Sequence, residues 1–222
     1  MKDLKAIKGR YYIRGLIEEG EHVHQDFKFA ISDARKIARS LSAFANNDGG
    51  RLLVGVKDNG AIAGVRNEED IYVIEQAAQM YCEPAQEIDV TAFACGEGAV
   101  VFRVEIQKAT RRPVVVKEAD GRRRAYFRVR DENIAADPLM VRAWRAAAAD
   151  RPCDTALRLG GPVEILLRLA DDPAGTTTEA FMREAHVSRA AAEETVVRLF
   201  ALSLLEFRYA DDRFRLFRKS PE

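Results

Sequence analysis

The stretch Ser42–Gly55, SAFANNDGGRLLVG, constrains the fold of this chain more than any other segment. An apolar run that ends in Ala43–Ala45 leads into Asn46, Asn47 and two glycines, and an apolar strand follows at Leu52–Val56. Two asparagines and two glycines within five residues supply the positive-φ conformations that a sharp reversal of the chain needs. The segment therefore predicts a helix that is followed closely by a buried strand.

The residues around this segment predict a mixed α+β domain over about residues 1–150. Apolar residues at helical spacing indicate helices over about residues 2–20, 33–45, 68–81 and 138–148, with Ser32 and Asp137 as N-caps of the second and fourth. Alternating or continuous apolar runs indicate strands over about residues 21–29, 52–56, 61–65, 88–94, 99–106, 113–117 and 124–129. The first of these strands is expected to place His22, His24, Asp26 and Lys28 on one polar face.

A second, smaller domain is predicted over about residues 160–222, after a boundary in Asp150–Gly161. Helices are expected over residues 163–170, 179–185 and 188–202, with Thr178 and Ser188 as N-caps of the last two. A hairpin of residues 204–209 and 213–217 follows. Three helices and a hairpin in this order are the plan of a winged helix-turn-helix, whose third helix would read DNA. Such folds also serve as docking or dimerisation modules.

Composition restricts the partners and the setting of the chain. The 35 basic and 35 acidic residues give a net charge of zero, so attraction to nucleic acid would come from local clusters. The three cysteines, Cys82, Cys95 and Cys153, are widely spaced and predict neither a disulfide framework nor a cysteine zinc site. Neither a signal peptide nor a membrane span is predicted, so we expect a cytoplasmic protein.

Several short motifs are similar to one known family. They are Glu21, Asp26-Phe27-Lys28, Ala43–Asn46, Gly49-Gly50, Gly55-Val56, Asp58 and Gly60. Over about residues 12–137 the chain resembles the Schlafen-type AlbA_2 family, which is catalogued as DNA-binding or divergent ATPase-like. The resemblance implies the α+β fold of that family and an association with nucleic acid. A P-loop is not indicated, because Val56-Lys57 stands where the Lys-Ser/Thr pair would be.

The resemblance also implies a set of acidic catalytic residues. In the RNA-cleaving Schlafen proteins the positions that match Glu21, Asp26 and Asp58 form a nuclease site, and converging carboxylates can hold a divalent metal. Two features depart from the family: Asp26 stands where glutamate is commoner, and Lys57 stands where an acid is frequent. The alternative is that Asp26 pairs with Lys28 and that Asp58 only forms the turn.

A second candidate metal set is the pair His22 and His24, which form an H-x-H-x-D pattern with Asp26. Neutral imidazoles at this spacing can chelate zinc or manganese, although two solvated histidines would give the same pattern.

Basic residues are concentrated between Lys108 and Arg130, where nine cations face only Glu118 and Asp120. Arginines interleaved with Tyr126 and Phe127 are typical of contact with a nucleic-acid backbone and bases. The alternative is a solvated hairpin that pairs with acidic stretches elsewhere, such as Glu18-Glu19. The predicted contact residues, with three from the second domain, are Arg111, Arg112, Lys117, Arg122, Arg123, Arg124, Arg128, Arg130, Arg189, Arg213 and Arg215.

These observations favour a nucleic-acid-binding protein, namely a transcriptional regulator that is homodimeric and binds DNA in preference to RNA. Two alternatives stay open: a metal-dependent nuclease that uses Glu21, Asp26 and Asp58, and a regulator that responds to a nucleotide. A divalent metal is the one cofactor that the sequence suggests, and no membrane partner is expected.

Overall fold

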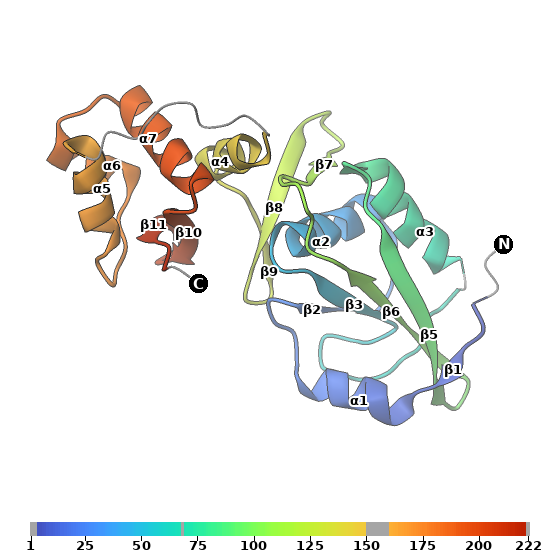
Figure 1. The fold of residues 1–222 in the computed structure, drawn as a ribbon. Helices are drawn as coiled ribbons and strands as arrows, with labels where there is room; N and C mark the ends of the chain where they lie inside the picture. The colour runs from blue at the N-terminus through green and yellow to red at the C-terminus, as the bar shows by residue number, and fades with distance from the viewer. Residues whose placement is uncertain (1–3, 68, 150–159, 221–222) are drawn as a thin grey trace. The chain divides into compact units, whose positions relative to one another are not determined.

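The computed structural model describes residues 4–67, 69–149 and 160–220, and it divides the chain into two compact units between Ala136 and Asp137 (Figure 1). The predicted helix near residue 140 is present as α4 (Pro138–Ala148), with Asp137 as its N-cap. This helix belongs to the second unit, whereas the sequence placed it in the first domain. Residues 150–159, which include Cys153 and most of the expected boundary, lie outside the described residues.

The first unit is built around a five-stranded sheet with the strand order β1-β5-β6-β3-β2. Its strands are β1 (Ile7–Lys8), β2 (Gln25–Lys28), β3 (Gly50–Val54), β5 (Ile88–Gly96) and β6 (Ala99–Ile106). The β5–β6 hairpin confirms the prediction for this region, while β2 pairs with β3 and β1 with β5 in parallel.

Helices cover both faces of this sheet (Figure 1), which explains why residues 52–54 of β3 are all apolar. These residues belong to the stretch Ser42–Gly55, which we call the signature segment. Leu53 faces α1 (Arg10–Glu18) and packs in one core with Ile13. Leu52 and Val54 face the opposite way and pack in a second core that includes α2 (Ala34–Asn46) (Figure 1). Alternate residues of a strand point to opposite faces, so a strand that is buried on both faces needs apolar residues throughout.

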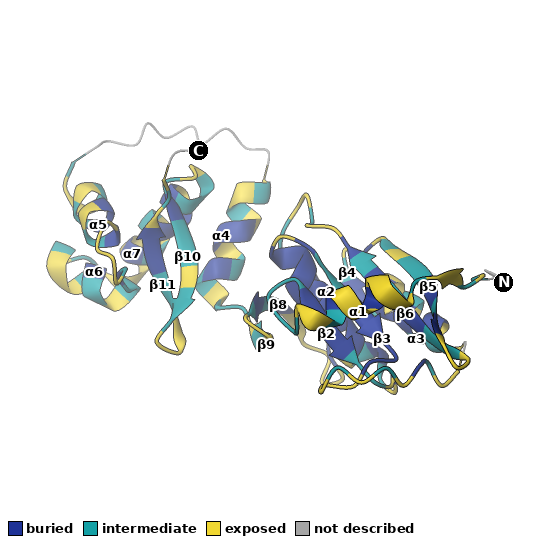
Figure 2. Ribbon diagram, turned by 90° about the horizontal axis from the view of Figure 1, so that it is seen from below, coloured by how far each residue is buried: buried dark blue, intermediate teal, exposed yellow. Residues whose placement is uncertain are grey.

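A second, four-stranded sheet encloses α2 from its other side. Its order is β4-β7-β8-β9, with β4 (Cys82–Glu83), β7 (Val115–Lys117), β8 (Arg123–Val129) and β9 (Glu132–Ala135). Val114, Val116 and Tyr126 from this part of the chain join the core around α2. Ten of the thirteen residues of α2 are therefore buried, and the helix is largely dark blue in Figure 2.

Several local predictions need correction. The N-cap of α2 is Asp33, whose carboxylate accepts from the Arg35 backbone N–H, and not Ser32. Residues 61–65 form no strand, since only a single bridge joins Ile62 to Val56. The helix expected over residues 68–81 is α3 (Asp70–Gln76), which continues as a π-helical turn, η1 (Ala77–Tyr81).

The strand expected over residues 21–29 is shorter than predicted and has no exposed polar face. It begins at Gln25, because His22 and His24 lie in the tight turn before it. Gln25, Asp26 and Phe27 are all buried. Period-two polarity indicated a half-exposed strand, but the polar residues here meet buried partners.

The second unit contains four helices and a hairpin within the described residues. After α4 come α5 (Pro162–Ala170), α6 (Thr178–Ala185) and α7 (Arg189–Ala201), then β10 (Leu205–Ala210) and β11 (Arg213–Arg218). Ser188 caps α7 as predicted, whereas Thr177 and not Thr178 caps α6. A core centred on Leu166, Phe181 and Val196 joins α5, α6 and α7 to the hairpin.

Candidate nucleic-acid interface and buried polar cluster

The two asparagines of the signature segment fasten the end of α2 to the four-stranded sheet. Asn46 Nδ2 donates to the carbonyl oxygens of Val114 and Tyr126 at 2.8 and 2.9 Å, and its Oδ1 accepts from the Val114 N–H at 2.8 Å. Asn47 exchanges two hydrogen bonds with the Arg128 backbone at 3.0 and 2.8 Å. Only Gly49 among residues 46–50 has positive φ, at +82°. The asparagines are therefore anchors of the β7–β8 region, not the turn formers that the sequence suggested.

Arg128, which the sequence assigned to the nucleic-acid surface, is instead the largest fully buried side chain of the described residues. Its guanidinium donates to the Gln25 carbonyl at 3.1 Å and to Asn133 Oδ1 at 3.0 Å, and it lies 3.4 Å from Asp26 Oδ1. It also lies over the Phe44 ring. A buried charge requires such partners. Arg128 therefore joins β8 to β2 and does not face a ligand at the surface.

Asp26 is the anionic centre of this cluster. Its Oδ2 lies 2.6 Å from Lys28 Nζ and accepts from Ser40 Oγ at 3.2 Å. Burial raises the pKa of Asp26, but the charge and hydrogen bond of Lys28, the hydrogen bond from Glu21 and the charge of Arg128 outweigh it. The pKa of Asp26 consequently lies below its ordinary value, and the carboxylate is ionised. The expected Asp26–Lys28 pair is present.

Glu21 lies beside Asp26 and has the opposite tendency. Its Oε1 accepts from the Phe27 backbone N–H at 2.8 Å. Burial, followed by the hydrogen bond to Asp26, raises the pKa of Glu21 above its ordinary value. As the pH falls, Glu21 therefore takes up a proton before Asp26 does.

The structure brings Glu21 and Asp26 together but leaves Asp58 in an exposed turn after β3. Among the described residues, no group of three His, Cys, Asp or Glu side chains could hold a metal ion. Both oxygens of Asp26 already face cations, which would repel a divalent metal. The three carboxylates thus do not fit the metal site that the resemblance implied. Lys57 lies over the Phe29 ring and not between the acids.

The two histidines that form the second candidate metal set have protein partners. His22 Nδ1 accepts from the His24 backbone N–H at 3.2 Å, and its Nε2 lies 3.5 Å from Glu19. His24 Nδ1 lies 3.1 Å from the Gly49 carbonyl. The rings are edge to face at 6.1 Å between centroids, so they do not converge on a point as the strand pattern predicted.

Four exposed cations of the first unit lie together on the β7–β8 hairpin. Lys117 and the three consecutive arginines Arg122, Arg123 and Arg124 are all exposed. Arg122 and Arg124 share Asp120 at 3.6 Å each, and Arg123 lies 2.9 Å from Glu83. Exposed pairs of this kind contribute little stability. These four side chains can consequently exchange their partners for phosphate groups.

Glu118, the other acidic residue of this region, does not neutralise the exposed arginines of the hairpin, because its carboxylate is buried beneath the hairpin. Arg39 grips its carboxylate with two hydrogen bonds of 2.9 and 2.6 Å, and the Tyr126 hydroxyl donates to it as well. The Arg39 hydrogen bond lowers the pKa of Glu118. Burial and the hydrogen bond to Glu118 raise the pKa of Tyr126 to about 12. This cluster supports the hairpin from below.

The remaining predicted cations of the first unit differ in position. Arg112 is half-buried and donates to the Asn46 carbonyl at 3.0 Å, so it neutralises the C-terminal end of α2. Arg111 and Arg130 are exposed, and Arg130 has positive φ in the turn between β8 and β9. Arg111 and Arg130 are therefore exposed at the end of β7 and β8 that lies opposite the turn of the hairpin, whereas Arg112 is held by α2.

The cations of the second unit are mostly paired within it. On α7, Arg189 lies 3.3 Å from Glu179 and 3.9 Å from Glu193, and Arg198 lies 2.9 Å from Glu194. On the hairpin, Arg215 lies 2.8 Å from Asp211, whereas Arg213 is exposed and has no ion pair among the described residues. Arg213 is therefore the predicted contact residue of this unit that is most available to a ligand.

Sequence reasoning missed the polar residues that join distant elements. Ser40 donates to Asp26 and accepts from Asn133 Nδ2 at 2.9 Å, and Arg39 grips Glu118. A partial signal existed, because the polar residues Ser40 and Ser42 stand within the mainly apolar second half of the helix. Their partners lie 14 to 93 residues away and could not be inferred from spacing.

The two sheets around α2, locked by signature asparagines, define the first unit as an α+β domain of the AlbA_2 type. The sequence profile described as Schlafen, AlbA_2 matches residues 21–137, which is more than half of the chain. The chain belongs to this family. None of the helices of the described residues is long and apolar enough to cross a membrane.

Solved structures that are similar to this chain include the following two. The DIP2311 protein from Corynebacterium diphtheriae shares 20% identity at a TM-score of 0.44, over 87% of this chain and 34% of that one. The N-terminal domain of a RecG-related protein from Nitrosomonas europaea shares 17% identity at a TM-score of 0.40, over 69% of this chain and 99% of that one. The present chain thus spans about a third of the DIP2311 protein. No curated protein sequence matches it significantly.

Proposed function

We propose that this chain is a nucleic-acid-binding protein whose principal contact is the cationic β7–β8 hairpin. The observation that carries the proposal is the set of exposed side chains Lys117, Arg122, Arg123 and Arg124, of which the three arginines have only weak surface ion pairs. Membership of the Schlafen AlbA_2 family supports a nucleic-acid-associated role.

The way in which the hairpin is held supports the same conclusion. Asn46, Asn47 and the Arg39–Glu118–Tyr126 cluster fix its inner side to α2 through buried hydrogen bonds. Because these hydrogen bonds hold the backbone of the hairpin in place, binding costs less conformational entropy than it would for a flexible loop. Because their contacts would be to phosphate, we expect strong salt dependence and little sequence preference.

We propose more specifically that the protein is a transcriptional regulator and that its second unit is a winged helix that contacts duplex DNA. The order of α5, α6, α7 and the β10–β11 hairpin supports this, and Arg213 would meet phosphate. The ion pairs of α7 and the burial of Ala192 restrict the side chains that this helix could offer to base edges. We therefore place the main contact on the first unit, and homodimerisation stays a prediction.

The test is the affinity for short mixed-sequence oligonucleotides, labelled and followed by fluorescence anisotropy. The triple variant Arg122→Glu, Arg123→Glu, Arg124→Glu should bind more weakly by about tenfold or more, because each reversal replaces attraction to phosphate by repulsion. Parallel titrations with single-stranded and duplex DNA and RNA establish which polymer is preferred.

The matched control is Lys5→Glu, Lys8→Glu, Lys57→Glu, which makes the same change in net charge at three exposed lysines outside the β7–β8 hairpin and the helix beneath it. This control should retain the wild-type affinity within about threefold, since screening limits the reach of distant surface charges. Equal losses in the two triple variants, or no binding by the wild type at low salt, would overturn the proposal. Metal-dependent cleavage of the oligonucleotide that Glu21→Gln abolishes would support the nuclease instead.

A further inference from the structure

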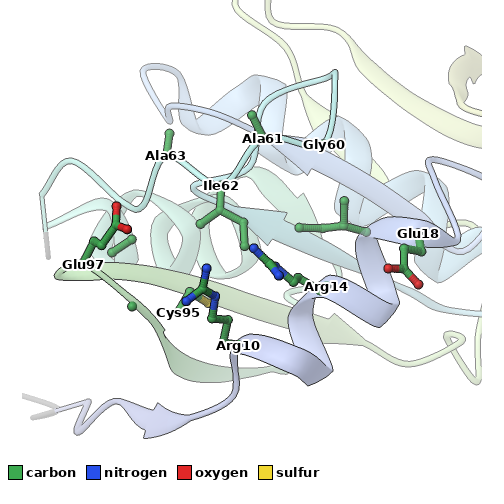
Figure 3. A pocket seen from close by; sticks show the side chains of 12 residues that line it. Arg10, Arg14, Glu18, Gly60, Ala61, Ile62, Ala63, Cys95 and Glu97 are labelled. Atoms are coloured by element: carbon green, nitrogen blue, oxygen red, sulfur yellow. The ribbon is translucent and has the colours of Figure 1, made fainter.

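A cavity of about 590 Å³ lies on the α1 side of the first unit, away from the residues of the cationic hairpin (Figure 3). Its walls are α1, the loop of residues 60–63 and the turn between β5 and β6. Small-molecule sites are typically about 300–1,000 Å³. The cavity is therefore large enough for an organic molecule and far larger than a single inorganic ion.

Two arginines on one face of α1, Arg10 and Arg14, extend their guanidinium groups side by side into this cavity (Figure 3). Among the described residues neither guanidinium group has an ion pair or a hydrogen bond with a protein group. Glu18 and Glu97 lie to either side of them and not between them in Figure 3. Two adjacent guanidinium groups repel each other, and an anion placed between them would relieve that repulsion.

The remaining walls are rigid and partly apolar. The loop is held by backbone hydrogen bonds from Lys57 to Ala61 at 3.0 Å and from Ala63 to Gly55 at 2.9 Å. Ile17 and Ile62 supply apolar surface. Gly96 has positive φ, and a Cβ there would lie 3.4 Å from Arg10 Nη1, so the arginine lies close above the backbone. The site thus combines a pair of cations with apolar surface beside it.

We propose that this cavity binds a small phosphorylated organic molecule, with the phosphate between Arg10 and Arg14. Each guanidinium presents a planar fork of donors. A carboxylate has two oxygens and is satisfied by one fork, whereas a phosphate offers enough oxygens for both forks at once. The apolar wall would receive the organic part. The proposal concerns a different surface from the hairpin and does not depend on nucleic-acid binding.

The experiment is an NMR titration of the full ¹⁵N-labelled chain at constant ionic strength, with pyrophosphate, AMP, adenosine and succinate as probes. We expect pyrophosphate and AMP to shift the Nε–Hε signals of Arg10 and Arg14 saturably. Adenosine, which lacks phosphate, and succinate, which carries only carboxylates, should bind about tenfold more weakly or not at all. Shifts without saturation, or equal binding of succinate, would overturn the proposal.

The variant Arg10→Gln, Arg14→Gln should lose about tenfold or more in affinity for AMP, while Arg66→Gln, at an exposed arginine elsewhere in the first unit, should stay within about twofold. Arg10→Lys, Arg14→Lys keeps the charge and the fold and should bind with intermediate affinity. Unchanged AMP binding in the glutamine variant would contradict the proposal. So would a 5′-phosphorylated oligonucleotide that shifts these signals when pyrophosphate and AMP do not, because the site would then take polymer phosphate.

Discussion

Arg128 shows at the scale of a residue why charge in a sequence does not locate a surface. It lies in a run of arginines, yet its side chain is 1% exposed and meets Asp26 and three polar groups. Its neighbours Arg124 and Arg130 are exposed. Arg124, Arg128 and Arg130 are an even number of residues apart, so strand alternation does not distinguish them. Arg128 is buried because its guanidinium has partners from β2, and the partner Asp26 lies 102 residues earlier in the chain. The sequence could not reveal this pairing.

Replacing Arg128 by methionine should therefore reduce stability and not only affinity. The loss should be about 3–5 kcal/mol, because Asp26 would keep a buried charge with one partner fewer. Urea unfolding measures it, and Arg122→Ala, at an exposed position, should change stability by about 0.5 kcal/mol or less. If Arg128→Met kept the wild-type stability but lost nucleic-acid binding, Arg128 would be a contact residue and not a structural one.

The acidic pair predicts a pH dependence whose sign differs between the two residues. The lowered pKa of Asp26 adds stability that is present above its unfolded value of 3.8 and is lost as the pH falls through the folded pKa. The raised pKa of Glu21 adds stability that is present below its unfolded value of 4.5 and is lost as the pH rises through the folded pKa.

Glu21→Gln should consequently remove the decline in stability above pH 4.5, while its amide oxygen still accepts from the Phe27 N–H. The free energy of unfolding at neutral pH should be equal to or above that of the wild type. Urea titrations at several pH values measure it. A fall of more than about 1 kcal/mol at neutral pH would show that an ionised Glu21 stabilises the fold.

At the scale of an element, the signature segment acts as the joint between α2 and both sheets. The sequence predicted the helix, the reversal and the strand correctly, since apolar periodicity and Gly49 define them locally. It did not predict β9 or the bonds from Asn46 to Val114 and Tyr126, because those pairings close loops of 68 and 80 residues. The hairpins β5–β6, β7–β8 and β10–β11 were predictable, whereas the expected strand over residues 61–65 and the long-range polar pairing were not predicted correctly.

Asn46→Ala should loosen the β7–β8 hairpin from α2. The substitution leaves the buried Val114 N–H without its acceptor and removes one donor from the carbonyls of Val114 and Tyr126, although Ser42 Oγ still donates to Val114. An unsatisfied buried group costs about 1–3 kcal/mol. Hydrogen exchange should become faster at amides of β7 and β8 and change less in β5 and β6. The control is Asn59→Ala, in an exposed turn. Equal hydrogen exchange in β7 and β8 of the two variants would show that Asn46 does not hold the hairpin to α2.

At the scale of the whole molecule, the division of the chain follows burial and not the local breaks in the pattern. The sequence favoured a boundary near Arg151-Pro152 and Gly160-Gly161, where helix-breaking residues gather. The compact units instead meet at Ala136, because Leu139 of α4 packs on the core of the second unit and α4 lies against α7.

A fragment of residues 137–222 should therefore fold on its own with a cooperative thermal transition. A fragment of residues 160–222 lacks α4 and exposes the surface of α7 that α4 covers, so its midpoint should be lower by at least about 4–8 °C, which corresponds to 1 kcal/mol in a domain of this size. Equal midpoints for the two fragments would place α4 outside the second unit.

We propose above all that the arginines of the β7–β8 hairpin neutralise phosphate groups of a nucleic acid. The most direct measurement is the slope of log affinity against log salt concentration for the wild type and for Arg122→Gln, Arg123→Gln, Arg124→Gln. Each lost phosphate contact should reduce the steepness by roughly 0.7–0.9, so the variant should be shallower by about 2–3. A slope equal to that of the wild type, with weaker or unchanged binding, would contradict the claim.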